Sequence, residues 1–541
     1  MRKIYILLIV ILLIGCKNDK KQHTNSNIYS KQDYSDLTLN QVAIDSFFVA
    51  NPESNSIKDE VIKFYKNRNY QCAWFNKTGM TQAVPNFYNQ LQNYSSDFND
   101  KQFYNPQLDT LITLIKTNKV DTKVNLINNK SLELLLTTTF FKYSKKVYGG
   151  IIKNPHNLDW FIPKNKKNYQ VVLDSLVISD NKNISKEPVN QYYIKLIEKL
   201  RQYRDIQKKG GFPIVITEKK TLKLNQIDSC LPKVKQHLFL TKDLQNNDNS
   251  QVFTKELELA VINFQKRLGL SENGKIDKQT LLELNKPVDF RINQMMVNLE
   301  RLRWIPVEMG KEFLLVNIPE FKLHVFENGK EIWLTNIVVG KDAKQTSIFK
   351  GNISKIILNP YWNVPNSIIN EEILPALKRN PAYLTKNNME VLSGEHIVNA
   401  SRINWKKYEK NIPFTIRQKP GRDNALGKMK FLFPNNFSIY LHDTPTKSLF
   451  NRTKRDFSHG CIRVENPMKL ALYFLKNNKE WNQVKIDSIL TTGKEFDISI
   501  KPTIPVYIAY FTAWVDNKGN LNFRNDIYDL DAALAKEIFA K

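Results

Sequence analysis

Residues 313–339, FLLVNIPEFKLHVFENGKEIWLTNIVV, decide the fold of the C-terminal half of the chain. Three runs of apolar, β-branched and aromatic residues follow one another at 313–318, 322–326 and 332–339. A Pro-Glu pair separates the first two runs and an Asn-Gly pair precedes the third, and both pairs suit tight turns. The stretch therefore predicts consecutive strands in a β-rich domain, which we place at 289–525.

The sequence on the C-terminal side of this stretch extends the domain. Further strands are predicted at 354–358, 436–441 and 505–514. Between them, 371–378 and 381–389 have helical spacing, which predicts an insertion at about 366–425. We expect this insertion to be a helical lid over a cleft, and we expect 526–541 to be a C-terminal tail.

Two short motifs after the insertion carry the chemistry. IYLHDTP occupies 439–445 and SHGCIRV occupies 458–464, so that His442 precedes Cys461 by 19 positions. A cysteine attacks as its thiolate, and a nearby histidine can take the thiol proton. Gly460 permits close backbone approach, so its amide and that of Cys461 are candidates for an oxyanion hole. Together these residues are sufficient for acyl transfer.

Residues 222–288 have a different character. Thr254 is placed to cap a helix with an apolar stripe from Leu257 to Leu268, and Gly269 is placed to end it. A second short helix is predicted from Thr280. The string AVINFQKRLGLSENGKIDKQTLLELN, at 260–285, resembles the peptidoglycan-binding domain of cell-wall enzymes, a small three-helix module.

The N-terminal region predicts export. Two basic residues precede an unbroken apolar run at 4–14, which predicts a signal peptide at 1–15. The residues LIGC at 13–16 resemble the lipobox of bacterial lipoproteins, which implies lipidation of Cys16; a simple signal peptide with an incidental cysteine is the alternative. Residues 16–40 lack apolar periodicity and predict a tether. Residues 41–215 show helical spacing, for example at 61–65 and 132–143, and predict a helical domain.

The composition restricts the partners. The 541 residues are enough for three or four domains, and 80 Lys and Arg against 53 Asp and Glu give a formal charge of +27. This balance favours an anionic partner, and export removes nucleic acid from the expected ones. No nucleotide, flavin or metal motif is present, so we expect no cofactor. Lipidation of Cys16 leaves an odd number of cysteines, of which Cys72 and Cys230 are expected to be buried thiols.

The two motifs resemble the catalytic domain of the L,D-transpeptidases of the YkuD type, whose signature is an upstream His followed by Ser-His-Gly-Cys-x-Arg. Five longer strings resemble the large, multi-domain periplasmic form of that family. They are NLERLRWIP from 298, NPYWNVPNSI from 359, NPAYLTKNNMEVL from 380, GRDNALGKMKFLFPN from 421 and IPVYIAYFTAWVD from 504. The resemblance covers about 222–525. It implies a multi-domain α+β protein with a helical scaffold domain, a three-helix module and a β-sandwich-like catalytic domain carrying the lid.

The resemblance also implies a reaction. Cys461 would attack the carbonyl of the third residue of a tetrapeptide stem and expel D-alanine, and the amine of a second stem would resolve the thioester into a 3→3 cross-link. His442 would take the thiol proton and later activate the amine. The main-chain carbonyl of Asp443 would orient His442, with a role for the Asp443 carboxylate as the alternative. Carbapenems are expected to acylate Cys461.

Other residues near the motifs are assigned to substrate binding, each with a structural alternative. Arg463 either binds a substrate carboxylate or holds its own loop, and His459 either orients the loop or serves as a second base. Aromatic residues of a β-rich domain are core residues by default. The assigned set is Tyr440, Trp362, Asn363, Ser458, His459, Arg463 and Asn424.

Three other functions remain open. A metal site of His442, His459 and Cys461 lacks the second Cys pair or the His-Glu helix motif of zinc sites. Hydrolysis of the same thioester would give an L,D-carboxypeptidase or endopeptidase, because only the acceptor differs. A non-catalytic wall-binding lipoprotein is the third, and the presence of both His442 and Cys461 counts against it. We expect a periplasmic protein on a lipid anchor, with peptidoglycan stems as its partners.

Overall fold

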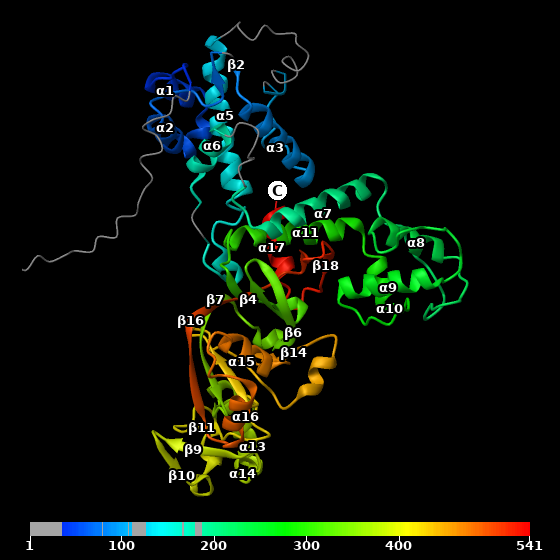
Figure 1. The fold of residues 1–541 in the computed structure, drawn as a ribbon, viewed down its shortest axis with the longest axis vertical. Helices are drawn as coiled ribbons and strands as arrows, with labels where there is room; N and C mark the ends of the chain where they lie inside the picture. Colours follow the sequence, from blue (N-terminus) through cyan, green and yellow to red (C-terminus); the bar gives the residue numbers. More distant parts are fainter. Residues whose placement is uncertain are drawn as a thin grey trace, which may run out of the picture. The chain divides into compact units, whose positions relative to one another are not determined.

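The computed structural model describes residues 35–77, 79–106, 108–110, 126–164, 167–178 and 187–540. The predicted signal peptide, Cys16 and most of the predicted tether lie outside these residues. None of the described helices is long and apolar enough to cross a membrane. The chain divides into two compact units, which are described separately (Figure 1).

The first unit is helical and comprises Met1–Leu91, Tyr104–Lys142 and Gln170–Ser185. It holds α1 (Gln41–Ala50), α2 (Lys58–Asn67), a hairpin of β1 (Phe75–Asn76) and β2 (Gly79–Met80), and most of each of α3 (Ala83–Phe98), α5 (Leu126–Val147) and α6 (Tyr169–Ile178). In its core, Glu133 accepts the N–H groups of Ala73 and Trp74 at 2.5 and 3.0 Å. Burial raises the pKa of Glu133. The helices expected at 61–65 and 132–143 are α2 and α5.

The second unit comprises Gln92–Phe103, Tyr143–Tyr169 and Lys186–Lys541. Its helices α7 (Gln191–Lys208), α11 (Val288–Trp304) and α17 (Leu530–Phe539) pack with a hairpin of β17 (Ala513–Val515) and β18 (Leu521–Phe523). The region 222–288 contains α8 (Leu231–Leu240), α9 (Lys255–Leu268) and α10 (Lys278–Leu284). Thr254 caps α9 by accepting the Leu257 N–H at 3.3 Å, and Gly269 ends it at φ +66°, as expected from the sequence.

The main sheet of the second unit carries both chemical motifs. Its strand order is β12-β13-β15-β6-β5-β4-β16-β7-β3, and β12 also pairs with β7, so the sheet closes on itself. The strands are β3 (Trp160–Phe161), β4 (Glu312–Asn317), β5 (Lys322–Glu327), β6 (Lys330–Gly340), β7 (Ile348–Leu358), β12 (Met429–Leu432), β13 (Leu441–His442), β15 (Ile462–Val464) and β16 (Phe496–Ala509), with β14 (Asp456–Ser458) beside β6. Helices α15 (Pro467–Leu475) and α16 (Gln483–Thr491) precede β16.

Most strands agree with the sequence. Those predicted within 313–339 and at 354–358 are confirmed by β4 to β7. The strand predicted at 436–441 begins only at Leu441, because Asn435 binds the backbone of residues 433–439 into a loop. The strand predicted at 505–514 is interrupted between β16 and β17.

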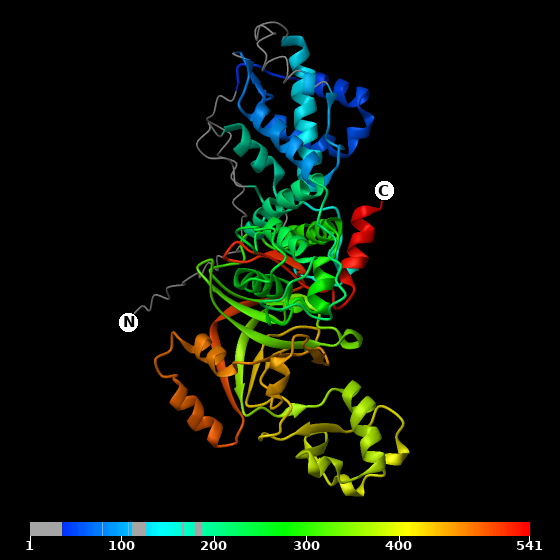
Figure 2. The same ribbon diagram turned by 90° about the vertical axis from the view of Figure 1, so that its right-hand side faces the viewer.

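The insertion contains a sheet as well as helices, so the prediction of a helical insertion is wrong in part. The helical segments are α12 (Asn366–Ile368), the π-helix η6 (Ile369–Ile373), α13 (Leu374–Arg379) and α14 (Tyr383–Lys386). They precede β9 (Met389–Ser393), β10 (His396–Val398) and β11 (Thr415–Gln418), which form a sheet with β8 (Trp362–Asn363) in the order β10-β9-β11-β8. These helices and strands form the yellow-green part of the ribbon (Figure 2). They bury a shared core around Trp405 and Ile416.

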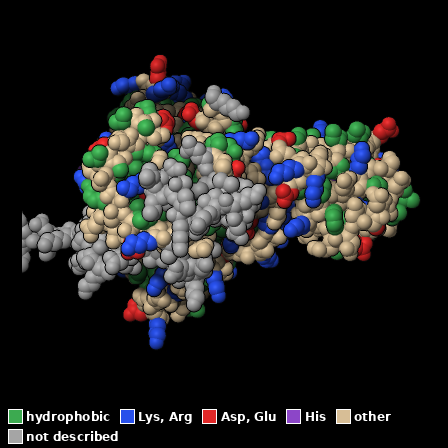
Figure 3. All heavy atoms as spheres, turned by 90° about the horizontal axis from the view of Figure 1, so that it is seen from above, with side chains coloured by type: hydrophobic (Ala, Val, Ile, Leu, Met, Phe, Trp, Pro, Cys, Tyr) green, Lys and Arg blue, Asp and Glu red, His purple; other side chains and the backbone are tan. Residues whose placement is uncertain are grey.

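Charged side chains are distributed over the surface. On the face shown in Figure 3, Lys and Arg side chains are scattered among Asp and Glu side chains. Several acids are engaged in ion pairs, such as Asp248 with Lys235 at 2.6 Å and Asp45 with Lys58 at 2.8 Å.

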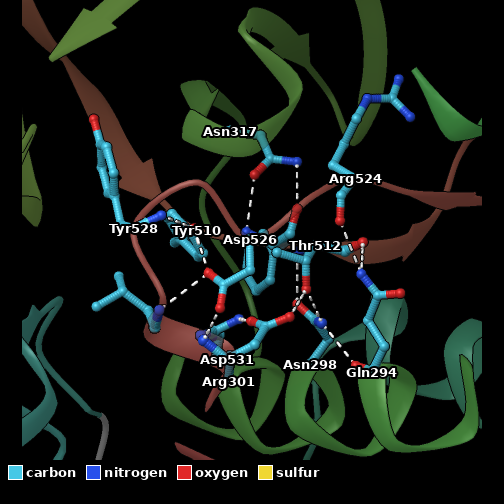
Figure 4. A network of polar contacts seen from close by, with 12 residues as sticks. Gln294, Asn298, Arg301, Asn317, Tyr510, Thr512, Arg524, Asp526, Tyr528 and Asp531 are labelled. Carbon is cyan, nitrogen blue, oxygen red and sulfur yellow. Dashed lines mark hydrogen bonds and ion pairs between the residues drawn. The ribbon is translucent and has the colours of Figure 1, made fainter. Parts of the chain in front are cut away.

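A buried polar network joins α11 to the last helix of the chain (Figure 4). Asn298 donates to the Thr512 hydroxyl at 2.7 Å and accepts the Thr512 N–H at 2.9 Å. Thr512 Oγ1 donates to Asp531 Oδ2 at 2.5 Å, and Asp531 also forms an ion pair with Arg301, which is 2% exposed. The prediction of a C-terminal tail at 526–541 is therefore wrong for α17, because this helix supplies the carboxylate that a buried arginine needs.

Candidate active site

The two chemical motifs lie on neighbouring strands. β13 and β15 run parallel, with Leu441 opposite Ile462 and His442 opposite Arg463. Leu441 and Ile462 are both 0% exposed and face the core. Because side chains alternate along a strand, the residues on either side of them project to the opposite face. That catalytic face carries Tyr440, His442, Cys461 and Arg463.

His442 is held as a neutral imidazole. Its Nδ1 lies 2.5 Å from the main-chain oxygen of Asp443, which leaves Nε2 as the acceptor when Nδ1 carries the proton. Burial lowers the pKa of His442 to about 3, and the positive charges of Arg463, Lys430 and Lys447 act in the same direction. A neutral imidazole is the form in which a histidine can accept a proton.

The carboxylate of Asp443 is engaged elsewhere. It accepts the Lys428 N–H at 2.8 Å and forms an ion pair with Lys447 at 2.5 Å. The part of Asp443 that contacts the imidazole is therefore its main-chain carbonyl.

The loop before Cys461 is fixed by the side chain of Ser458. Its Oγ accepts the Gly460 N–H at 3.1 Å and donates to the Cys461 carbonyl at 2.6 Å. Thr346 Oγ1 donates to the Gly460 carbonyl at 2.8 Å, and Gly460 has a φ of +114°, which only glycine adopts readily. The Gly460 amide, which the sequence assigns to an oxyanion hole, is thus engaged. The Cys461 amide has no partner among the described residues.

The thiol of Cys461 lies between backbone and aromatic groups. Sγ is 3.6 Å from the Ser438 carbonyl oxygen, to which the thiol donates, and it is hydrogen-bonded to the Tyr440 hydroxyl. Burial raises the pKa of Cys461, while the charges of Lys430 and Arg463 oppose this rise. The resting group is a protonated thiol, so attack on a carbonyl requires a base.

The residues assigned to substrate binding separate into two groups. Trp362 on β8 hydrogen-bonds the Tyr440 hydroxyl, so the structure brings β8, which pairs with β11 of the insertion, to the thiol. Asn363, the next residue, is exposed. Asn424 is 1% exposed, and its amide donates to three backbone carbonyls at 2.9 to 3.4 Å and accepts the Leu426 N–H at 2.8 Å. In this conformation Asn424 holds the loop where the insertion rejoins the sheet.

Acidic residues of η6 contact the loops around Cys461. Glu372 Oε1 lies 2.7 Å from His459 Nε2, and Glu371 Oε1 lies 2.6 Å from Lys344 Nζ. Lys344 belongs to the loop 341–346, whose Thr346 binds Gly460. The sequence does not mark these two acids, because their contacts depend on how the insertion folds back.

Lys430 also lies at the site and is absent from the residues that the sequence singles out. Its Nζ is 4.0 Å from the centroid of the Tyr440 ring. Apolar and polar residues alternate along 429–432, and this pattern could have indicated the orientation of Lys430. Met429 and Phe431 face the core, so Lys430 projects to the opposite face.

Two further thiols are present among the described residues. Cys72 and Cys230 are buried and free, and burial raises the pKa of both, that of Cys230 to about 12. Across the described ranges, no three His, Cys, Asp or Glu side chains are grouped so that they could hold a metal ion.

Comparison with known proteins identifies two regions. Residues 311–486 match the L,D-transpeptidase catalytic domain (YkuD), and residues 59–200 match a scaffold domain. The chain is 37% identical over 239 residues to a putative L,D-transpeptidase of Haemophilus influenzae. The aligned residues make up 44% of this chain and 48% of that relative. The chain thus spans about half the length of the curated relative it matches.

The solved structures that resemble this chain have lower sequence identity to it than the Haemophilus influenzae relative has. An L,D-transpeptidase from Stackebrandtia nassauensis is 14% identical, covering 48% of this chain and 91% of that one, with a TM-score of 0.21. An L,D-transpeptidase from Mycobacterium smegmatis is 13% identical, covering 37% and 58%, with a TM-score of 0.19.

Proposed function

We propose that this protein is a cysteine-dependent L,D-transpeptidase that forms 3→3 cross-links between peptidoglycan stem peptides. The observation that carries the proposal is the register of β13 and β15, which puts Cys461 and His442 on one face with His442 Nδ1 on the Asp443 carbonyl. This arrangement supplies a thiol and a neutral base whose free nitrogen is Nε2.

The proposed reaction has two acyl transfers. His442 Nε2 takes the thiol proton, and Sγ attacks the carbonyl of the third stem residue. The Cys461 amide stabilises the oxyanion, the C–N bond to D-alanine breaks, and the protonated imidazole gives its proton to the leaving amine. The side-chain amine of a second stem then attacks the thioester, His442 takes a proton from it, and the thiol is regenerated with a new amide bond.

Hydrolysis of the same thioester is the second candidate. Water in place of the amine would make the protein an L,D-carboxypeptidase or endopeptidase, with the same roles for Cys461 and His442. A wall-binding lipoprotein without catalytic activity is the third candidate. Such a protein would need neither the Cys461 thiol nor the His442 imidazole.

The setting is part of the proposal. The segment at 1–16 supports a lipoprotein exported to the periplasm and anchored to a membrane through Cys16. The excess of basic residues suits a polymer whose stems carry carboxylates. The region 222–288 would bind peptidoglycan, and carbapenems would acylate Cys461.

Mass spectrometry of the products tests the proposal. Protein lacking residues 1–16 is incubated with disaccharide-tetrapeptide, beside Cys461→Ala. We expect a cross-linked dimer with loss of one D-alanine from the unsubstituted protein alone. Free tripeptide without dimer would establish the hydrolytic reading, and the absence of any Cys461-dependent product would favour the wall-binding reading.

A further inference from the structure

A row of three side chains crosses three neighbouring strands on the catalytic face. Lys430 on β12 is directly opposite His442 on β13, and His442 is directly opposite Arg463 on β15. Residues directly opposite on adjacent strands project to the same face. Phe431, next to Lys430, is 0% exposed and lies in the core, so Lys430 projects to the other side. The proposed base is therefore flanked by a cation on each side.

Neither cation is neutralised by the described part of the chain. Among those residues, no carboxylate lies within ion-pair distance of Lys430 or Arg463, and Arg463 Nε is buried without a hydrogen-bond partner. Glu495 acts on Lys430 only from beyond ion-pair distance, and it accepts the Tyr361 N–H. A sequestered charge without a counter-charge costs free energy. Two such charges beside a nucleophile indicate a site for an anion.

The position of Lys430 places this anion near the thiol. Its Nζ lies 4.0 Å from the centroid of the Tyr440 ring, and the Tyr440 hydroxyl is hydrogen-bonded to Cys461. Arg463 lies two residues after Cys461 on the same face. Both cations therefore lie on the same face of the sheet as Cys461.

We propose that Lys430, together with Arg463, binds a carboxylate of the donor stem peptide and so positions the donor against Cys461. This inference rests on the proposed function. A tetrapeptide stem has a terminal carboxylate on the leaving D-alanine, and it has a second one when its third residue is a diamino dicarboxylic acid. Both offer the same chemistry to Lys430, and the experiment distinguishes them.

Binding an anion here also changes the base. The charges of Lys430 and Arg463, with that of Lys447 and with burial, suppress protonation of His442, while its hydrogen bond to the Asp443 carbonyl favours it. A bound carboxylate would screen the two flanking cations and raise the proton affinity of His442. Donor binding would thereby be coupled to deprotonation of the Cys461 thiol.

Alkylation of Cys461 tests the anion site without a stem peptide. Iodoacetate and iodoacetamide react with the same thiolate and differ in one carboxylate. In the full chain, we expect the ratio of the iodoacetate rate to the iodoacetamide rate at Cys461, followed by peptide mass spectrometry, to exceed that of free glutathione about tenfold. Lys430→Met, which keeps the length of the side chain, should remove this preference, and Lys430→Arg should keep it.

A matched control and a folding check accompany the variants. Lys350 on β7 also lies over a tyrosine ring, that of Tyr507 on β16, at 5.3 Å, and Lys350→Met should leave the ratio unchanged. Thermal unfolding shows whether each variant is folded, and Lys430→Gln replaces Lys430→Met if the latter is not. An unchanged ratio in the folded uncharged variant, Lys430→Met or Lys430→Gln, overturns the proposal. A fall in both alkylation rates by the same factor also overturns it, because Lys430 would then act on the thiolate alone.

Donor peptides identify the carboxylate and separate this inference from the proposed function. For the unsubstituted protein, amidation of the carboxylate that is bound should raise the KM for D-alanine release about tenfold, and Lys430→Met should abolish that difference. Amidation of the other carboxylate should have no such effect. If no donor releases D-alanine while the alkylation ratio depends on Lys430, the transpeptidase proposal fails and the anion site stands. Equal KM values for all donors with an active enzyme overturn the donor role of Lys430.

Discussion

The imidazole Nδ1 of His442 lies 2.5 Å from the main-chain oxygen of Asp443, the next residue in the chain. The peptide carbonyl accepts a hydrogen bond from Nδ1–H and is not itself titratable. The orientation of the ring therefore does not depend on a carboxylate. The Asp443 side chain is then free to serve the fold, and it does so through Lys428 and Lys447.

Substitution of Asp443 separates its two parts. We expect Asp443→Asn to keep kcat/KM within about threefold, because the carbonyl remains, and to lower the free energy of unfolding by about 1 kcal/mol, since the Lys447 partner is half exposed. His442→Gln should lower kcat/KM by about 100-fold or more. Steady-state release of D-alanine measures both. Equal losses in the two variants would assign the orienting role to the carboxylate.

Gly427 lies against the same carboxylate. A Cβ added at this position would be 2.4 Å from Asp443 Oδ2, and the backbone has a φ of +61°. We expect Gly427→Ala to lower the free energy of unfolding by about 2–4 kcal/mol, through the clash and the left-handed backbone. Gly329→Ala is the control, because φ is +76° there but nothing lies within 4 Å of the added Cβ. Urea unfolding should show a clearly smaller loss for Gly329→Ala, and equal losses would mean that backbone conformation alone sets the cost.

His324 gives the second unit a stability that depends on pH. It lies 2.9 Å from both Glu320 and Glu331, and these carboxylates raise the pKa of His324 to about 9 against its burial. Because the folded pKa exceeds the ordinary value of about 6.5, this stabilisation is complete below about pH 6.5 and is lost as the pH rises through about 9. The loss should be roughly 2–3 kcal/mol. Urea unfolding at pH 6 and pH 9.5 should show a smaller difference for His324→Gln than for the unsubstituted chain, and an identical difference would remove His324 as its cause.

The 2.7 Å contact between Glu372 Oε1 and His459 Nε2 links the insertion to the loop that carries Cys461. We expect Glu372→Gln to increase hydrogen exchange of residues 458–461 and to change the KM of the stem peptide by about threefold, the scale of a partly exposed ion pair. Asp497→Asn breaks a similarly exposed pair, with Lys355 on the main sheet, and should leave that exchange unchanged. Unaltered exchange in Glu372→Gln would show that the insertion and this loop are not coupled through His459.

The elements that the sequence predicts correctly are those set by local patterns. Strands β4 to β6 follow from apolar runs divided by turn residues, and α9 follows from its cap at Thr254 and its stop at Gly269. The sheet of the insertion is missed because β9 to β11 are short, and their pairing with β8 joins residues far apart in the chain. Helix α17 is missed for a related reason. Its Asp531 forms an ion pair with Arg301, which lies more than 200 positions earlier in the chain.

The candidate site shows the same division. His442 and Cys461 are found from motif chemistry, and the alternation of β12 contains a local signal for Lys430. Glu372 carries no local signal, because its contact with His459 depends on the folded position of η6. The engagement of the Gly460 amide by Ser458 is likewise a property of the loop conformation, which residue types do not specify.

The parallel pairing of β4 with β16 joins the start of the catalytic domain to its end, with Leu314 opposite Val506. The insertion and both chemical motifs lie between these two strands, so the contact order of the domain is high and folding is expected to be slow. During synthesis, β4 presents an unpaired edge until the last strand has emerged, and such an edge attracts other chains. The nascent protein should therefore depend on a chaperone that keeps it unfolded until β16 is complete.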